Sequence, residues 1–230
     1  MTLTQGFLLP LFWALSLSSL TGKSEAAPTE VESKDESEIL LESLTEKHEN
    51  TPSLSALDLA MEGYEKLENE LKKPILTVID FTLPSTEKRL WIIDVEKKEI
   101  LLNTVVSHGR NSGMLMAEKF SNLPESFQSS LGFYKTAETY SGKHGYSLRL
   151  DGLEKGINDQ ARNRAIVIHG ADYAREEVAK MSGRLGRSLG CPAVPTELSQ
   201  EVIDLIKDGS LLFIYGQDQK YLAESPLLQP

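Results

Sequence analysis

Apolar residues recur with two different periods along the chain, and the change of period divides it into segments. Between residues 53 and 73, the apolar positions lie three and four residues apart: Leu54, Leu57, Met61, Tyr64, Leu67 and Leu71. This spacing places them on one face of a helix. Ser53 or Ser55 would cap the start of that helix, and Pro74 would end it. We therefore predict an amphipathic helix over residues 53–73 that docks on the rest of the protein.

From residue 75 onward the apolar residues instead form short runs rich in Ile, Val and Leu, which is typical of strands. The runs lie at residues 75–81, 89–95, 100–106, 146–152, 164–169 and 210–216. Short polar connections between the first three predict an antiparallel meander. A further helix is expected at about residues 197–208, before Gly209. The fold class is therefore mostly β with a few helices, in one domain over residues 74–217 with a C-terminal tail at 218–230.

The first 52 residues have a different character. Residues 6–20 are an uncharged apolar run followed by small and polar residues, so we expect a signal peptide or short anchor over residues 1–26. The run is shorter than the roughly 20 apolar residues of a membrane helix. No Lys or Arg precedes this run, so the segment could instead remain as an uncleaved anchor. Such an anchor would be the one possible contact of the protein with a membrane. Residues 27–52 are rich in Glu and Ser, which predicts an acidic disordered tether.

Composition and charge narrow the class of protein. The chain of 230 residues is 40% hydrophobic and 25% charged, as in an ordinary globular protein. Its formal net charge is −10, and most of the acidic excess lies before residue 74. A nucleic-acid partner is not expected for such a charge.

Cys191 is the only cysteine and lies between Gly190 and Pro192, with Ser188 nearby. A turn of this composition would expose the sulfur. A glycine before a nucleophile leaves room for a substrate carbonyl and leaves backbone N–H groups for a developing oxyanion. The alternative is a buried cysteine that acts as a small apolar residue.

Four histidines could act as the base for such a thiol. His169 ends the most apolar predicted strand and precedes Gly170, so a rigid element would hold its ring and it is our preferred base. A buried structural histidine is the alternative. His108 follows a predicted strand, where a structural role is equally compatible, and His144 lies in a glycine-flanked loop that could line a cleft. His48 falls in the acidic tether and is expected to be solvated. No metal site is expected, because the sequence has no H-E-x-x-H motif and no cysteine pair.

Taken together, these motifs resemble a known family. His169-Gly170 followed by Ser188-x-Gly190-Cys191 resembles the signature of the L,D-transpeptidase catalytic domain (YkuD-like), which cross-links bacterial peptidoglycan. The segments "SSLGFY", "GKHGYSLRLDGLE", "RAIVIHGADY" and "GRLGRSLGCPA" resemble the murein L,D-transpeptidase catalytic domain family in particular. The resemblance covers about residues 75–216 and implies an L,D-transpeptidase-like β-sandwich or barrel.

The resemblance implies a role for each matching residue. Cys191 would be the nucleophile, His169 its base, and the carbonyl of Gly170 would orient the imidazole. The N–H groups of Gly190 and Cys191 would form the oxyanion hole, beside the Ser188 hydroxyl. The thiolate would attack the third residue of a peptidoglycan stem peptide, release the terminal D-alanine and pass the acyl group to an amine, without any metal or organic cofactor. The protein would then be exported, to the periplasm or cell envelope.

Two positions depart from the family pattern, which often has His before the Gly-Cys pair and Arg or Asn shortly after it. Here these positions are Leu189 and Ala193. Recognition of the substrate carboxylate is therefore unassigned, and six residues are candidates for binding substrate: His144, Tyr146, Arg149, Arg187, Arg184 and Lys143. Residues 173–187 are expected to form a basic lid over the site.

Three alternatives were weighed against a transpeptidase. A papain-like thiol peptidase is disfavoured, because in that class the cysteine precedes the histidine along the chain. An L,D-carboxypeptidase with the same fold would pass the acyl group to water. A non-catalytic cell-wall-binding module would not need Cys191 at all.

Overall fold

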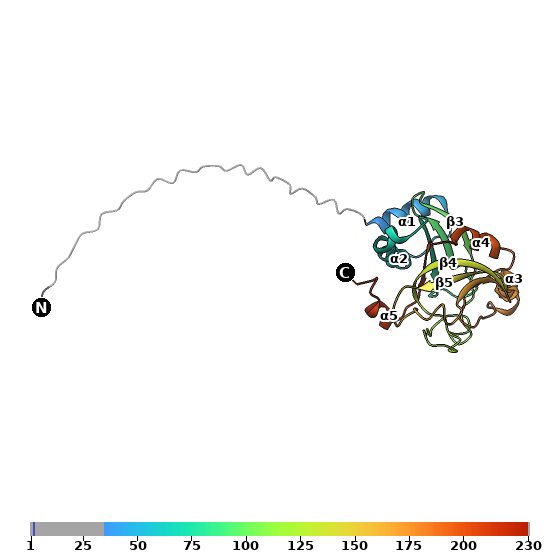
Figure 1. Cartoon of the computed structure of the whole chain (residues 1–230). Coiled ribbons are helices and arrows are strands. Elements are labelled where there is room, and N and C mark those ends of the chain that lie inside the picture. Colours follow the sequence, from blue (N-terminus) through green and yellow to red (C-terminus); the bar gives the residue numbers. More distant parts are fainter. Residues whose placement is uncertain (1, 3–34, 230) are drawn as a thin grey trace. The chain divides into compact units, whose positions relative to one another are not determined.

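The computed structural model describes residue 2 and residues 35–229, and Figure 1 shows the chain. The predicted signal peptide or anchor over residues 1–26 lies outside these residues, as does the first part of the predicted tether. None of the helices in the described part has the length and apolar character needed to cross a membrane.

Eight strands form one mixed sheet in the order β3-β2-β1-β8-β4-β5-β6-β7. They are β1 (Ile75–Asp80), β2 (Leu90–Asp94), β3 (Glu99–Thr104), β4 (Gly132–Gly142), β5 (Gly145–Gly152), β6 (Val167–Gly170), β7 (Ala193–Val194) and β8 (Leu211–Tyr215). The antiparallel pairing of β1 with β2 and of β2 with β3 confirms the predicted meander. The prediction of a mostly β fold with a few helices is confirmed.

Burial explains which strands were recognisable from the sequence. Every residue of β1, β2 and β8 is buried, and strands covered on both faces appear as continuous apolar runs. Only the first half of β4 is mostly buried, and its second half is polar and partly exposed. No apolar run therefore marked β4, which lies between β8 and β5.

Two helices precede the sheet, and the first corrects a prediction. α1 (Glu36–Lys47) lies where the disordered tether over residues 27–52 was expected. Leu40 and Leu44 are 2% and 0% exposed and belong to the main core. The Ser37 hydroxyl also donates to Asp58 of the next helix at 2.9 Å. Contacts with the folded domain therefore order a segment whose composition alone favours disorder.

The second helix, α2 (Leu54–Leu67), confirms the predicted amphipathic helix. The Ser53 hydroxyl caps it by accepting the N–H of Ala56 at 3.3 Å, and a 3₁₀ turn at Glu68–Glu70 follows. A Cβ added at Gly63 would overlap the ring of Phe133 in β4. The helix thus packs directly on the sheet, as Figure 1 shows.

The remaining helices lie toward the C-terminus: η2 (Asp172–Ala174), α3 (Glu176–Ser182), α4 (Ser199–Ile206) and α5 (Gln219–Glu224). α4 confirms the helix expected at residues 197–208, and Gly209 after it has a φ of 99°. The predicted tail at 218–230 contains α5. Tyr221 in that helix is 5% exposed, and the Ser225 hydroxyl after it donates to the buried carboxyl of Glu154.

Candidate active site

The pairing of β6 with β7 brings the predicted base and nucleophile to the same edge of the sheet. His169 in β6 pairs with Ala193 in β7, in parallel register. Cys191 lies in the turn that leads into β7, so this turn runs beside the end of β6. Residues far apart in the sequence are brought together by this short strand pair.

The imidazole of His169 is held by the next residue. Its Nδ1 lies 2.9 Å from the carbonyl oxygen of Gly170. A carbonyl only accepts, so Nδ1 carries the proton and Nε2 keeps its lone pair. His169 is 2% exposed, and burial lowers the pKa of its imidazole. The ring is therefore neutral near pH 7 and able to accept a proton at Nε2.

A second imidazole lies against the first. The ring centroids of His144 and His169 are 4.3 Å apart, and the ring planes are inclined by 25°. His144 lies in the turn between β4 and β5, and its own side chain is exposed. His144 therefore lies beside the predicted base, and the prediction that it lines a cleft and binds substrate stays a prediction.

The thiol of Cys191 is half-buried and directed at the backbone of the chain before β6. Its Sγ lies 3.6 Å from the carbonyl oxygen of Ala165, as a weak S–H donor would. Burial raises the pKa of the thiol, whereas the N–H groups of Val167 and Cys191 and the charge of Arg164 act in the opposite direction. With burial the largest effect, the cysteine is a protonated thiol in this state.

The turn before Cys191 depends on glycine. Gly190 has a φ of 126°, and a Cβ there would lie 2.8 Å from the carbonyl oxygen of Gln128 and 3.1 Å from Arg164 Nη2. A side chain at this position would therefore meet both backbone strain and steric overlap. The glycine permits close approach of the turn to residues 128 and 164.

Ser188 closes the same turn and corrects the expected oxyanion hole. Its hydroxyl accepts the N–H of Gly190 at 3.0 Å and donates to the carbonyl oxygen of Cys191 at 2.6 Å. The N–H of Gly190 is thus already bonded, although it was expected to face an oxyanion. Of the two expected donors, only the N–H of Cys191 has no acceptor in another described residue. Ser188 therefore shapes the turn.

These features agree with a match at the level of the sequence. Residues 48–215 match the family model described as L,D-transpeptidase catalytic domain. The chain belongs to this family. Members of the L,D-transpeptidase family act on peptidoglycan stem peptides. The sequence matches no curated protein.

Several solved structures resemble this L,D-transpeptidase domain at low sequence identity. The cell shape determining protein Pgp2 (K307A mutant) of Campylobacter jejuni has 12% identity and a TM-score of 0.43, covering 69% of this chain and 54% of that one. The L,D-transpeptidase of Stackebrandtia nassauensis has 16% identity and a TM-score of 0.38, covering 71% and 67%. The L,D-transpeptidase of Mycobacterium smegmatis has 13% identity and a TM-score of 0.39, and the match covers 62% of this chain and 59% of that one. This chain thus spans less than two thirds of the Mycobacterium smegmatis chain it matches.

Two residues near the Cys191 thiol were not predicted. Arg164 is half-buried, donates to the carbonyl oxygens of Ser121 and Gln128 at 2.7 and 2.5 Å, and acts electrostatically on Cys191. Burial, with the charge of Cys191 as a second cause, raises the pKa of Tyr173 to about 12. In the sequence Arg164 looks like a solvated residue at the start of a strand, and nothing local marks either residue.

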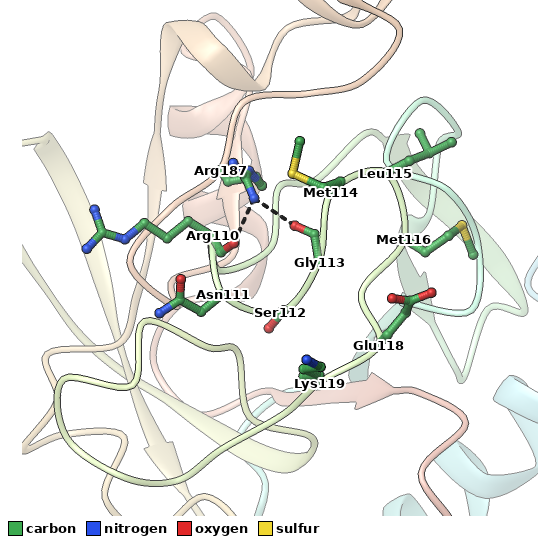
Figure 2. Close-up of a pocket in the computed structure, with 10 residues that line it drawn as sticks. All are labelled: Arg110, Asn111, Ser112, Gly113, Met114, Leu115, Met116, Glu118, Lys119 and Arg187. Atoms are coloured by element: carbon green, nitrogen blue, oxygen red, sulfur yellow. Dashed lines mark hydrogen bonds between the residues drawn. The ribbon is translucent and has the colours of Figure 1, made fainter.

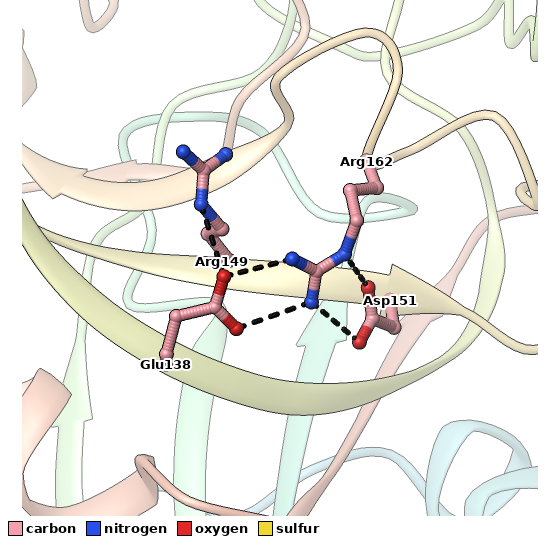
Figure 3. Close-up of polar contacts among 4 residues, drawn as sticks. All are labelled: Glu138, Arg149, Asp151 and Arg162. Atoms are coloured by element: carbon pink, nitrogen blue, oxygen red, sulfur yellow. Dashed lines mark hydrogen bonds and ion pairs between the residues drawn. The ribbon is translucent and has the colours of Figure 1, made fainter.

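Two of the predicted substrate-binding residues are engaged elsewhere. The Tyr146 hydroxyl donates to Asp204 of α4 at 2.9 Å. Arg149 stacks over the ring of Tyr140 at 4.5 Å and pairs with Glu138 at 3.2 Å. Figure 3 shows that Glu138 also binds the guanidinium of Arg162, which reaches on to Asp151. Both side chains therefore already have partners within the domain, and their role in binding substrate stays a prediction.

The other cationic candidates lie in different surroundings. Arg187 donates to the carbonyl oxygens of Arg110 and Gly113 at 2.7 and 3.0 Å, as Figure 2 shows. It lines an open pocket of about 450 Å³ that is formed mainly by residues 110–119. Arg184 donates to the carbonyl oxygen of Leu185, and Lys143 is exposed in the same turn as His144. Arg187 thus braces the 110–119 loop.

The segment expected to be a lid is anchored. Residues 173–187 contain most of η2 and all of α3, and Leu185 is fully buried with Val105 and Ala179. The N–H of Leu185 donates to the Ser85 hydroxyl at 3.2 Å, and the N–H of Gly186 donates to the carbonyl oxygen of Tyr173 at 2.7 Å. The segment is therefore a packed wall of the domain, which corrects the prediction of a lid.

The two remaining histidines have structural partners. His108 is fully buried, and its Nδ1 accepts from Arg89 Nη2 at 2.8 Å, so the structural alternative holds for this residue. His48 was expected to be solvated, but its Nε2 accepts the N–H of Ile100 in β3 at 3.3 Å. The packing of α1 brings His48 to the sheet. Among the described residues, no group of three or more His, Cys, Asp or Glu could hold a metal ion.

Proposed function

We propose that this protein is a peptidoglycan L,D-transpeptidase that forms a thioester between Cys191 and a stem tetrapeptide. The observation that carries the proposal is the pairing of His169 with Ala193, which sets the Cys191 turn beside the strand that ends in the base. The hydrogen bond from His169 to Gly170 supports it, because that bond leaves Nε2 as the proton acceptor.

The first half-reaction starts from a neutral thiol and a neutral imidazole. Nε2 of His169 accepts the thiol proton as Sγ of Cys191 attacks the carbonyl carbon of the third stem residue. The negative oxygen that forms accepts a hydrogen bond from the Cys191 N–H. The bond to the terminal D-alanine then breaks, its nitrogen takes the proton from the imidazolium, and a thioester remains.

The second half-reaction transfers the acyl group. An amine of a neighbouring stem attacks the thioester carbonyl while His169 accepts a proton from it. The C–S bond breaks, the sulfur regains a proton from the imidazolium, and a new amide cross-link is released. No step needs a metal ion, because the base and the backbone N–H supply the proton transfer and the charge stabilisation.

The substrate decides where such an enzyme works. Peptidoglycan lies outside the cytoplasmic membrane, so the catalytic domain must be exported. The apolar run at residues 6–20 supports export as a signal peptide or an anchor. We place the protein in the periplasm or cell envelope.

Mass spectrometry of the protein with a disaccharide-tetrapeptide tests the proposal. A thioester adduct on Cys191 and a cross-linked dimer are expected, and both are lost in Cys191→Ala. A tripeptide product without a dimer identifies an L,D-carboxypeptidase instead. If neither product forms and Cys191→Ala behaves like the native chain, the protein is a wall-binding module and the proposal is wrong.

A further inference from the structure

The hairpin that joins β4 and β5 ends directly over the catalytic edge of the sheet. Gly142 pairs with Gly145, so Lys143 and His144 form its two-residue turn. Gly145 has a φ of 74°, which favours glycine, and no atom lies within 4 Å of an added Cβ. In the next strand pair, Ser147 of β5 lies opposite His169. The turn is therefore within reach of the His169 ring through backbone geometry alone.

His144 uses this position to cover a ring face of His169. The 4.3 Å centroid distance and 25° inclination are those of a stacked pair. The hydrogen bond from Nδ1 to the Gly170 carbonyl oxygen fixes one edge of the ring, but the ring can still tilt about that bond. A flat partner on the face restricts the tilt, and the direction of the Nε2 lone pair depends on it.

From this geometry we infer that His144 is a positioning residue, which stacks on the His169 imidazole and aims its Nε2 at the thiol of Cys191. The inference rests on the proposed function, in which His169 is the base. His144 acts through His169 and need not touch the substrate. The β4–β5 hairpin is thereby coupled to the reactivity of the cysteine.

The stacked pair also has an electrostatic consequence. Two imidazoles at this distance do not both carry a charge easily. The neighbouring ionisable groups are Lys143, which is exposed in the same turn as His144, and Cys191, which lies in the turn that leads into β7; the neutral Ser199 of α4 packs on Gly170. After burial, charge on His144 is a second cause that lowers the pKa of His169. Removing the charge of His144 should therefore raise the pKa of the base.

Two substitutions separate stacking from charge in the full chain. His144→Ala removes both, whereas His144→Phe keeps a flat ring without charge. Ser141→Ala is the matched control, at an exposed position of the same hairpin that is not a candidate for binding substrate. The measurements are kcat/KM for disaccharide-tetrapeptide and the rate of Cys191 alkylation by iodoacetamide, each from about pH 5 to pH 9.

We expect His144→Ala to lower kcat/KM and the alkylation rate near pH 7 about tenfold, since small misplacements of a catalytic group are costly. His144→Phe should restore both to within about threefold and move the acidic limb of kcat/KM to higher pH, because His169 must be neutral to act. Ser141→Ala should match the native protein.

The inference is overturned if His144→Ala matches Ser141→Ala in both assays, or if His144→Phe is as slow as His144→Ala. A failure of the proposed function gives a different result. In that case Cys191→Ala and His169→Ala leave the processing of disaccharide-tetrapeptide unchanged, and the iodoacetamide rates still test the stacking.

Discussion

The hydroxyl of Ser188 donates to the carbonyl oxygen of Cys191 across a distance of 2.6 Å. The same hydroxyl accepts the N–H of Gly190, so a single oxygen ties both ends of the nucleophile turn together. Ser188 is 5% exposed, and water cannot easily replace these bonds. The direction of the Cys191 N–H depends on this arrangement.

Replacing Ser188 with Ala should loosen the turn. Two buried groups lose their partner, which costs about 1–3 kcal/mol of unfolding free energy. We also expect acyl-enzyme formation to slow at least about tenfold as the Cys191 N–H shifts. Mass spectrometry of the thioester and urea unfolding measure the two effects. Ser55→Ala, at an exposed position of α2, is the control, and equal behaviour of the two variants would contradict this prediction.

Gly190→Ala should lower the free energy of unfolding more than Gly156→Ala, although both glycines have a positive φ. Gly190 has a φ of 126° and lies close to Gln128 and Arg164, whereas Gly156 has a φ of 81° and open space around it. We expect a loss of about 1 kcal/mol for Gly156→Ala from backbone strain alone, and at least about 2 kcal/mol for Gly190→Ala. Urea unfolding of the two variants measures these losses of unfolding free energy. Equal losses would contradict the prediction, because they would show that the turn can shift to make room for the added methyl group.

The Cys191 thiol of the free protein should be protonated near pH 7, so that its alkylation there depends on proton transfer to His169. Burial raises the pKa of Cys191 and lowers that of His169, so the pair is neutral near pH 7. Alkylation by iodoacetamide should then still be rising with pH at about 8.5, the usual thiol pKa, because burial raises the pKa of Cys191. A plateau of fast alkylation between about pH 5 and pH 8 would indicate a thiolate–imidazolium pair instead.

His108 should make the folded protein sensitive to mild acid. Burial, followed by the charge of Arg89, lowers the pKa of His108 to about 4. Between about pH 6.5 and that value, the unfolded chain binds a proton that the folded protein does not. The free energy of unfolding should therefore fall as the pH drops through this window, by up to about 3 kcal/mol from this residue.

Urea unfolding at several pH values measures the slope. His108→Gln should flatten it, and the smaller contribution of the same sign from His169 should remain. An unchanged slope in the variant would assign the acid sensitivity to other groups.

The first helix should contribute to the stability of the domain. Leu44 is fully buried, so Leu44→Ala should cost about 2–5 kcal/mol of unfolding free energy. Leu54→Ala is the control, because Leu54 is 44% exposed and its loss should cost well under 1 kcal/mol. Equal, small losses in thermal unfolding would mean that α1 does not pack on the domain in solution.

Local patterns were sufficient to predict much of this protein. Strands buried on both faces are runs of Ile, Val and Leu, and the face of α2 repeats every three to four residues, so these elements could be predicted. His169 and Cys191 could also be proposed as a base and nucleophile from the sequence, because a rigid strand end and a glycine turn are local features. The family signature added the order of the two residues along the chain.

What only the tertiary structure decided is which polar groups meet. The stacking of His144 on His169 and the placing of Arg164 near Cys191 join segments that are distant in the sequence. The hydrogen bonds of Ser188 depend on a turn geometry that no residue pattern specifies. The same holds for α1. Its composition alone favours disorder, and the packing of Leu40 and Leu44 in the main core orders it. Periodicity records which face of an element is buried, but the partner of each buried or bonded group is set by long-range packing.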